Sequence, residues 1–242
     1  MTAFARGLAS GADGIECDVH LSRDGIPVVI HDATLERTTN ASGPVAARTA
    51  AELSAVDAAF HFAPQDGYPL RGQGIGVPTL EALLRRFSET RVIIEAKDGG
   101  APLAHAIADV LGRTGTAAHV CIGSFHHDTL AAFRAAAPGV ETSASEHEAR
   151  WTLYRSWARW PLASRGPHVA FQVPERAGRL RVVSPAFVRQ VHREGRTLQV
   201  WVVDRAEDMR RLLDWGVDGL ISDMPDIAVE TRNAWQSAHL SV

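Results

Sequence analysis

The chain alternates short apolar runs with segments of helical periodicity, and this alternation limits the folds that are open to it. Seven runs have the length of a strand, and most are rich in valine and isoleucine: 14–19, 91–97, 119–124, 140–144, 169–173, 198–203 and 219–222. Between these runs, apolar residues recur at the three- and four-residue spacing of helices. Such an alternation is typical of βαβ units whose parallel sheet is covered on both faces.

An eighth extended run, 26–31, follows the first run across Arg23-Asp24-Gly25. Asp-Gly between extended segments indicates a tight hairpin, so we expect this run to pair antiparallel outside the repeat. The stretch 38–77 lacks a clean period, and glycines crowd its second half. We therefore expect an inserted loop region there, with a short helix at 50–57, inside a single domain that spans residues 1–242.

Helices are expected where an apolar stripe coincides with start and stop signals. The predicted helices are 80–87 with Thr79 as its N-cap, 103–111 ending at Gly112, 128–137, 146–159, 185–194, 206–215, and a last one that starts after Pro225.

Composition excludes several classes of protein. The 242 residues include 25 basic and 28 acidic side chains, so the net charge of −3 offers no basic footprint for nucleic acid. Cys17 and Cys121 are the only cysteines, which excludes a disulfide framework and a cysteine-based zinc site and fits a reducing cytoplasm. No apolar run approaches the length of a transmembrane helix, and residues 1–13 lack the apolar stretch of a signal peptide. We therefore expect a cytoplasmic protein without nucleic-acid partners.

Two acids lie in the first strand-like run with the spacing of one strand face. Side chains alternate along a strand, so Glu16 and Asp18 share one face while Cys17 and Val19 share the other. In a closed parallel barrel the acids would face the interior, where unpaired carboxylates are costly. Near the C-terminal end of a strand, such a pair could supply oxygen ligands to a hard divalent cation such as Mg²⁺ or Ca²⁺.

The run 91–97 shows the same spacing of charged residues, with Glu95 and Lys97 on one strand face. Glu95 could be a third ligand, and the compact charge of Lys97 suits a phosphate oxygen. Alternatively, the two side chains neutralise one another inside the barrel, or they lie on a solvated edge. Both pairs occur at matching strand ends, and this coincidence favours a functional interpretation.

Histidines and one tryptophan complete the set of candidate residues. His31 closes the hairpin arm and could act as a general acid or base, although a turn histidine is the commoner case. We interpret His20 as structural, and His126 and His127 as loop or helix-start residues. Trp201 could stack on a substrate or belong to the core. Motifs of the phosphate-binding loop, the dinucleotide fold, the nucleophile elbow and the zinc proteases are not found in the sequence.

Eight blocks of sequence follow one another in a specific order: GADGIECDV at 11–19, DGIPVVIHD at 24–32, LERTT at 35–39, VPTLE at 77–81, IEAK at 94–97, GSF at 123–125, VWVVD at 200–204 and GVDGLISDMP at 216–225. In this order they resemble the signature of the glycerophosphodiester phosphodiesterase family over nearly the whole chain. The resemblance implies a TIM-type (β/α)₈ barrel of the phospholipase-C-like phosphodiesterase kind. It also implies metal-dependent hydrolysis of glycerophosphodiesters to sn-glycerol 3-phosphate and an alcohol, in glycerophospholipid metabolism.

Roles for individual residues follow from the same resemblance. It implies that Glu16, Asp18 and Glu95 bind the divalent cation, Mg²⁺ or Ca²⁺. It also implies that His31 is one of two catalytic histidines and that Lys97 lies near the phosphate.

By the same resemblance, Trp201 lines the substrate pocket. Family members usually begin with a strand that ends in His-Arg-Gly, which supplies the second histidine, and this sequence does not show that strand. We therefore expect seven barrel strands plus a hairpin, with the first barrel strand missing. Two hypotheses follow: a working phosphodiesterase, or a truncated, weakly active or inactive member that binds a cation and phosphate. A relative that cleaves phosphoinositides or sphingomyelin is a third interpretation.

Overall fold

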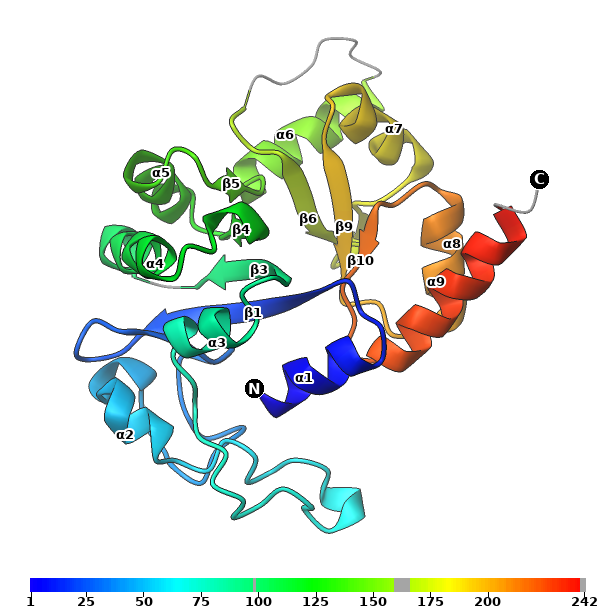
Figure 1. The fold of residues 1–242 in the computed structure, drawn as a ribbon. Helices are drawn as coiled ribbons and strands as arrows, with labels where there is room; N and C mark the ends of the chain where they lie inside the picture. The colour runs from blue at the N-terminus through cyan, green and yellow to red at the C-terminus, as the bar shows by residue number, and fades with distance from the viewer. Residues whose placement is uncertain (98, 159–165, 240–242) are drawn as a thin grey trace. The chain divides into compact units, whose positions relative to one another are not determined.

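The structure is a computed structural model that describes residues 1–97, 99–158 and 166–239 (Figure 1). The chain divides into two compact units. The first comprises Met1 and residues 16–140, and the second comprises residues 2–15 and 141–242.

The first unit contains four neighbouring strands in the order β2-β1-β3-β4. Strand β2 (Pro27–Val29) pairs antiparallel with β1 (Gly14–Leu21), which confirms the predicted hairpin. Strand β3 (Arg91–Ala96) pairs parallel with β4 (Val120–Gly123), as expected of strands joined by a helical crossover.

Two helices of the first unit begin at a side-chain cap. Thr79 accepts a hydrogen bond from the N–H of Ala82 at the start of α3, and Thr49 forms a capping box with Glu52 at the start of α2. The helical segments of this unit are η1 (Val45–Ala47), α2 (Ala50–Ser54), η2 (Pro64–Asp66), α3 (Leu80–Arg86), α4 (Gly100–Thr114), η3 (Ala117–His119) and α5 (His127–Ala136).

Two predicted helix ends are wrong. Helix α4 continues through Gly112 to Thr114, and its C-cap is Gly115, whose φ of 70° lies in the left-handed region that glycine adopts readily. A glycine inside a helix costs only about 1 kcal/mol, and the buried Val110 and Leu111 offset this by packing. Helix α2 ends at Ser54 instead of residue 57.

The predicted insertion, 38–77, is mainly turns and loops around the short helical segments η1, α2 and η2. A small apolar core supports it and also includes Val28 of β2; its buried members are Val28, Leu35, Val45, Ala50, Leu53 and Val77. A Cβ atom at Gly76 would collide with the carbonyl oxygen of Ser54, so this close approach requires glycine.

The second unit is built on a parallel sheet in the order β10-β9-β6. Its core includes Phe171 and Phe187, whose rings meet edge to face with centroids 5.9 Å apart. The strands are β5 (Glu141–Thr142), β6 (Ala170–Pro174), β9 (Thr197–Trp201) and β10 (Gly219–Leu220), and the helices are α1 (Thr2–Ala9), α6 (Glu146–Trp157), α7 (Pro185–Arg193), α8 (Ala206–Asp214) and α9 (Pro225–His239).

All seven predicted strand runs contain a strand, and each predicted helix is found with ends that differ by a few residues. The last residue of the predicted helix 146–159 lies outside the described residues. A two-residue hairpin of β7 (Arg176–Ala177) and β8 (Leu180–Arg181) was not predicted, because it is too short to show a strand period. Within the described ranges, no helix has both the length and the apolar character needed to cross a membrane.

Candidate active site

The two faces of β1 differ as the alternation of its side chains predicts. Cys17 and Val19 are buried on one face, whereas Glu16 and Asp18 on the other are half-buried. Burial raises the pKa of the Cys17 thiol well above its ordinary value, and the negative charges of Glu16 and Asp18 raise it further. Cys17 is therefore an inert core residue, and the chemistry of this strand lies on its acidic face.

Strand β3 lies beside β1 and adds the second pair of charged residues. Ile94 and Ala96 are buried, while Glu95 and Lys97 remain accessible, so the predicted alternation also holds here. The N–H of Lys97 donates to the carbonyl oxygen of Val19 at 3.1 Å. This backbone bond fixes the end of β3 next to the acidic face of β1.

The side chains of both strands converge into one cluster. Glu16, Asp18 and Glu95 each offer a carboxylate oxygen, and these oxygens lie within 4.8 Å of one another. The Lys97 Nζ lies 2.9 Å from Asp18 Oδ1 and 2.6 Å from Glu95 Oε1. Burial lowers the pKa of Lys97, but hydrogen bonds and charge interactions with Glu95 and Asp18 outweigh it and raise that pKa, so the ammonium stays charged.

A divalent cation fits this cluster by charge and by donor type. Three carboxylates gather here, and the ammonium of Lys97 lies against two of them, Asp18 and Glu95. Half-buried like charges repel one another strongly at this separation. Carboxylate oxygens are the ligands that Mg²⁺ and Ca²⁺ prefer, and a divalent cation would offset this repulsion.

His31 follows β2 and carries a fixed hydrogen-bond arrangement. Its Nδ1 lies 2.7 Å from Asp32 Oδ1, and Arg37 binds the same carboxylate through Nε at 2.6 Å and Nη2 at 2.8 Å. Hydrogen bonds from Arg37, and to a lesser extent from His31, outweigh desolvation and hold the pKa of Asp32 well below its usual range. An ionised carboxylate only accepts, so Nδ1 is the donor, and Nε2 is left to take up or release a proton.

His31, Glu95 and Lys97 line one pocket, which has a volume of about 370 Å³. It is lined by His20, His31, Asp32, Ala33, Glu95, Lys97, Phe125 and His126. The structure therefore brings His31 and Lys97 to the same pocket as the metal-ligand candidate Glu95, whose carboxylate lies with those of Glu16 and Asp18.

Two histidines that we did not assign to the site, His20 and His126, also line the pocket. His126 lies in the loop after β4, where its N–H donates to Ser124 Oγ, and that hydroxyl donates to the carbonyl oxygen of Ala96. This pair of bonds fixes the loop to the end of β3 beside Lys97. The one available signal was that His126 follows a strand end, where α/β proteins place ligand-binding residues.

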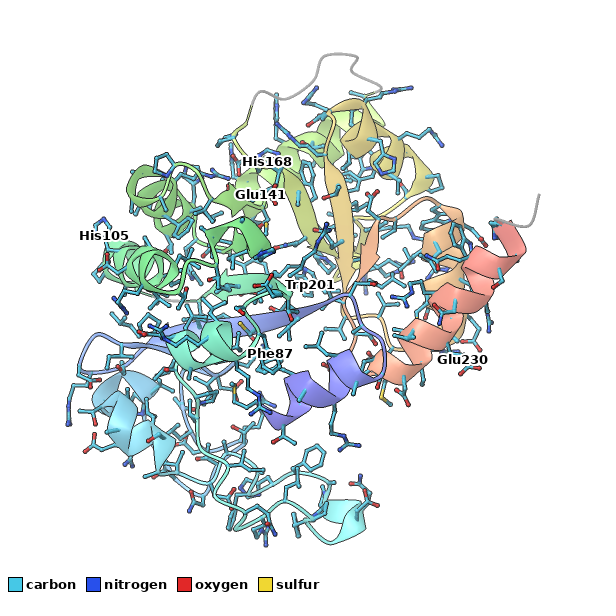
Figure 2. The ribbon with its side chains drawn as sticks, viewed as in Figure 1. Phe87, His105, Glu141, His168, Trp201 and Glu230 are labelled. Carbon is cyan, nitrogen blue, oxygen red and sulfur yellow. The ribbon has the colours of Figure 1, made fainter. Side chains whose placement is uncertain are left out.

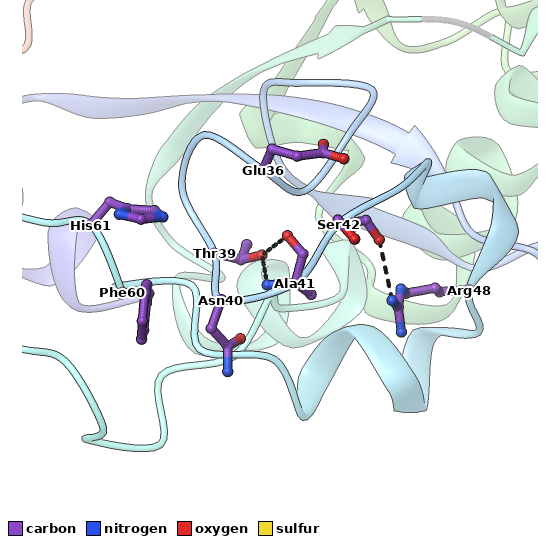
Figure 3. Close-up of a pocket in the computed structure, with 8 residues that line it drawn as sticks. All are labelled: Glu36, Thr39, Asn40, Ala41, Ser42, Arg48, Phe60 and His61. Atoms are coloured by element: carbon purple, nitrogen blue, oxygen red, sulfur yellow. Dashed lines mark hydrogen bonds between the residues drawn. The ribbon is translucent and has the colours of Figure 1, made fainter.

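A second hollow of about 500 Å³ lies in the inserted region (Figure 3). Its polar groups largely hold the surrounding loops: Arg48 donates to the carbonyl oxygen of Ser42, and Thr39 Oγ1 bonds to the backbone of Ala41. The lining residues are Glu36, Thr39, Asn40, Ala41, Ser42, Arg48, Phe60 and His61. None of the predicted site residues is among them.

Trp201, which is labelled in Figure 2, is the last residue of β9 in the second unit. It is half-buried and pairs in register with Pro174 of β6. Its role toward the substrate stays a prediction.

Comparisons with known proteins agree with the motifs. The family model of the glycerophosphoryl diester phosphodiesterase family matches residues 1–227. A glycerophosphodiester phosphodiesterase of Bacillus altitudinis is 30% identical over 96% of this chain and 91% of its own length. Another, of Caldanaerobacter subterraneus subsp. tengcongensis, is 31% identical over 95% of this chain and 89% of its own length.

Solved structures confirm the predicted fold class, the (β/α)₈ barrel of this family. The glycerophosphoryl diester phosphodiesterase domain of a Mycobacterium tuberculosis protein matches with a TM-score of 0.80 at 23% identity, covering 94% of this chain and 91% of that one. A phosphodiesterase of Oleispira antarctica, solved with the product sn-glycerol-3-phosphate, matches with a TM-score of 0.75 at 21% identity, covering 96% and 89%. The chain belongs to the glycerophosphoryl diester phosphodiesterase family.

Proposed function

We propose that this chain hydrolyses glycerophosphodiesters to sn-glycerol 3-phosphate and an alcohol, with the help of a divalent cation. The observation that carries this proposal is the convergence of three carboxylates, one ammonium and the His31–Asp32 pair beside one pocket. Family membership and the product-bound relative support the substrate class. We assign the reaction to glycerophospholipid metabolism in the cytoplasm, a location that fits the small number of cysteines.

Glu16, Asp18 and Glu95 are the residues that would hold the cation, Mg²⁺ or Ca²⁺. A bound divalent cation supplies Lewis-acid stabilisation of charge on a phosphoryl oxygen. Lys97 lines the pocket and presents a fixed ammonium that can donate to another oxygen of the same phosphate. Hydrogen bonds and charge interactions with Glu95 and Asp18 raise the pKa of this ammonium, which favours its charged form.

His31 is the acid–base group of the proposed reaction. Asp32 fixes the Nδ1–H tautomer, and the charge of Asp32 stabilises the imidazolium that forms when Nε2 takes a proton. Nε2 can accept a proton from the attacking water or, once protonated, return one to the leaving alkoxide. Trp201 completes the assignment as a residue that contacts the substrate.

Release of sn-glycerol 3-phosphate from glycerophosphocholine tests the proposal. Product release is measured with Mg²⁺ or Ca²⁺, with and without EDTA. The proteins compared are the wild type, Asp18→Ala and the control Asp66→Ala, which changes an exposed acid of η2. We expect EDTA and Asp18→Ala to abolish turnover and Asp66→Ala to leave it unchanged. Metal-independent turnover, or turnover insensitive to Asp18→Ala, would contradict the assigned site.

Two further outcomes separate the alternatives. Cation and phosphate binding without turnover of any diester would point to a binding module. Turnover of phosphatidylinositol or sphingomyelin vesicles, with glycerophosphocholine left intact, would point to a relative that acts on membrane lipids.

A further inference from the structure

We propose that His20 is a positioning residue that holds the backbone of His31 in its catalytic place. This inference rests on the proposed function, because it assigns His20 a role only through His31. The observation is a hydrogen bond between the His20 Nε2 and the carbonyl oxygen of His31, at 3.0 Å. A carbonyl oxygen only accepts, so the Nε2 of His20 carries the proton and donates it.

The hairpin ladder ends one residue before the catalytic histidine. Within β1 and β2, His20 lies opposite Val28, and beyond β2 the N–H of Ile30 still donates to the carbonyl oxygen of Asp18 at 3.0 Å. His31 follows this last backbone bond. The hydrogen bond from the His20 imidazole to the carbonyl oxygen of His31 therefore follows directly after the last backbone hydrogen bond of the hairpin.

The two histidines differ in burial in the way expected if His20 holds His31 in place. His20 is 6% exposed, whereas the side chain of His31 is 63% exposed. An exposed side chain gains little orientation from packing, so its position depends on its hydrogen bonds. Asp32 fixes the imidazole of His31 through Nδ1, and His20 fixes the main chain from which that imidazole extends.

The same bond ties His31 to the acidic cluster. His20 and Asp18 share one face of β1, so the strand that supplies a proposed metal ligand also supplies the support of the acid–base group. Displacing a reacting group by about 1 Å can cost on the order of 10²-fold in rate. The proposed role of His20 in catalysis is therefore to set the position of His31 relative to the acidic cluster.

Replacement of His20 by two amides tests this role. The side-chain nitrogen of glutamine reaches about as far as Nε2, while that of asparagine reaches only as far as Nδ1. We expect His20→Gln to keep kcat near the wild-type value, and His20→Asn to lower kcat by roughly tenfold to a hundredfold with a smaller change in KM. His105→Asn, at an exposed histidine of α4, is the matched control.

Double variants show whether His20 works through His31. In a His31→Ala background, His20→Asn should cause little further loss, because two residues that act as a unit are not additive. Calorimetric titration with Mg²⁺ or Ca²⁺ should give the same affinity for His20→Asn as for the wild type. This readout would change if the substitution merely disordered β1 and its acids.

The outcomes separate this inference from the function on which it rests. If His31→Ala itself leaves kcat unchanged, the assignment of the catalytic residue fails. If His31→Ala lowers kcat but His20→Asn does not, or if the two losses multiply, the positioning role of His20 is overturned. Loss of activity in His20→Gln equal to that in His20→Asn would overturn it as well.

Discussion

Two groups of charged side chains in this protein illustrate opposite uses of burial. The acidic cluster, Glu16, Asp18, Glu95 and Lys97, lies in the first unit. The side chains of Asp18, Lys97 and Glu95 are 16–21% exposed. The balanced cluster of the second unit contains Glu148, Arg155, His168, Glu194 and Arg196 (His168 is labelled in Figure 2).

The balanced cluster pairs its charges internally. The side chain of Glu194 is fully buried and accepts hydrogen bonds from Arg155 at 3.0 Å and from Arg196 at 2.8 Å. Arg196 also donates to the carbonyl oxygen of Gly166 and lies 2.6 Å from the Nε2 of His168. With Glu148 included, two carboxylates face two guanidiniums, so the charges of these four side chains match in number.

The difference lies in charge balance and access to the pocket. A buried group whose charges cancel serves the fold, because its members compensate one another's lost hydration. A half-buried group in which three carboxylates gather beside an open pocket is a candidate site for a ligand of opposite charge. Substitutions in the two clusters should therefore act on different quantities.

The largest expected effect is on catalysis, from Asp18→Asn. Loss of one ligand should reduce kcat/KM by about 10³-fold or more, since metal stabilisation of the transition state is worth several kcal/mol. The unfolding temperature in EDTA should not fall, because the substitution removes one of three repelling carboxylates. Steady-state kinetics measure kcat/KM, and thermal unfolding measures the unfolding temperature. If Asp18→Asn is folded and fully active, the acidic cluster has no catalytic role that the balanced cluster lacks.

Glu194→Gln should show the opposite pattern. It leaves Arg155 and Arg196 buried with too little negative charge, which typically costs about 3–5 kcal/mol of unfolding free energy. The kcat of the folded fraction should stay at the wild-type value. Urea unfolding, with kinetics well below the transition, measures this, and an unchanged midpoint would show that the cluster does not support the fold.

Lys97→Met should produce an intermediate effect on activity. The substitution removes a charged donor to the phosphate, which is worth about 1.5–3 kcal/mol, or roughly tenfold to a hundredfold in kcat/KM. It also leaves Asp18 and Glu95 without their ammonium partner. Cation affinity measured by calorimetry should therefore rise while turnover falls; a fall in both would show that Lys97 helps to hold the cation site together.

The smallest expected effect concerns pH and Asp32. The folded pKa of Asp32 lies below its unfolded value, so its interactions stabilise the fold above the unfolded pKa, and this stabilisation is lost as pH falls through the folded pKa. Arg37→Met removes the largest cause and should raise the folded pKa of Asp32. The difference in unfolding free energy from the wild type should then be greatest near neutral pH and shrink in acid; a difference that grows in acid would reverse the assigned sign.

The sequence predicts well what depends on local alternation. Glu16, Asp18, Glu95 and Lys97 were placed on the correct strand faces because side-chain direction along a strand is fixed every second residue. The antiparallel hairpin could be predicted from a second local signal, the turn residues Asp24-Gly25 between two extended runs.

Contacts that depend on loops or distant pairing were not predictable. Asp32 accepts hydrogen bonds from Arg37, which lies in the loop that follows it. His126 lines the pocket only because of the path that the loop after β4 takes. The pairing of Arg155 with Glu194 joins residues 39 apart in the sequence, and no local pattern marks either partner. Periodicity defines faces, whereas such contacts are set by tertiary packing.

Calorimetric titration with Mg²⁺ or Ca²⁺ tests the central claim most directly, that the acidic cluster and not the balanced one holds a divalent cation. The proteins compared are the wild type, Asp18→Asn and Glu148→Gln, the last of which changes an acid of the balanced cluster. We expect one binding event in the wild type, its loss in Asp18→Asn and its retention in Glu148→Gln. Wild-type affinity in Asp18→Asn, or no binding to the folded wild-type protein, would contradict it.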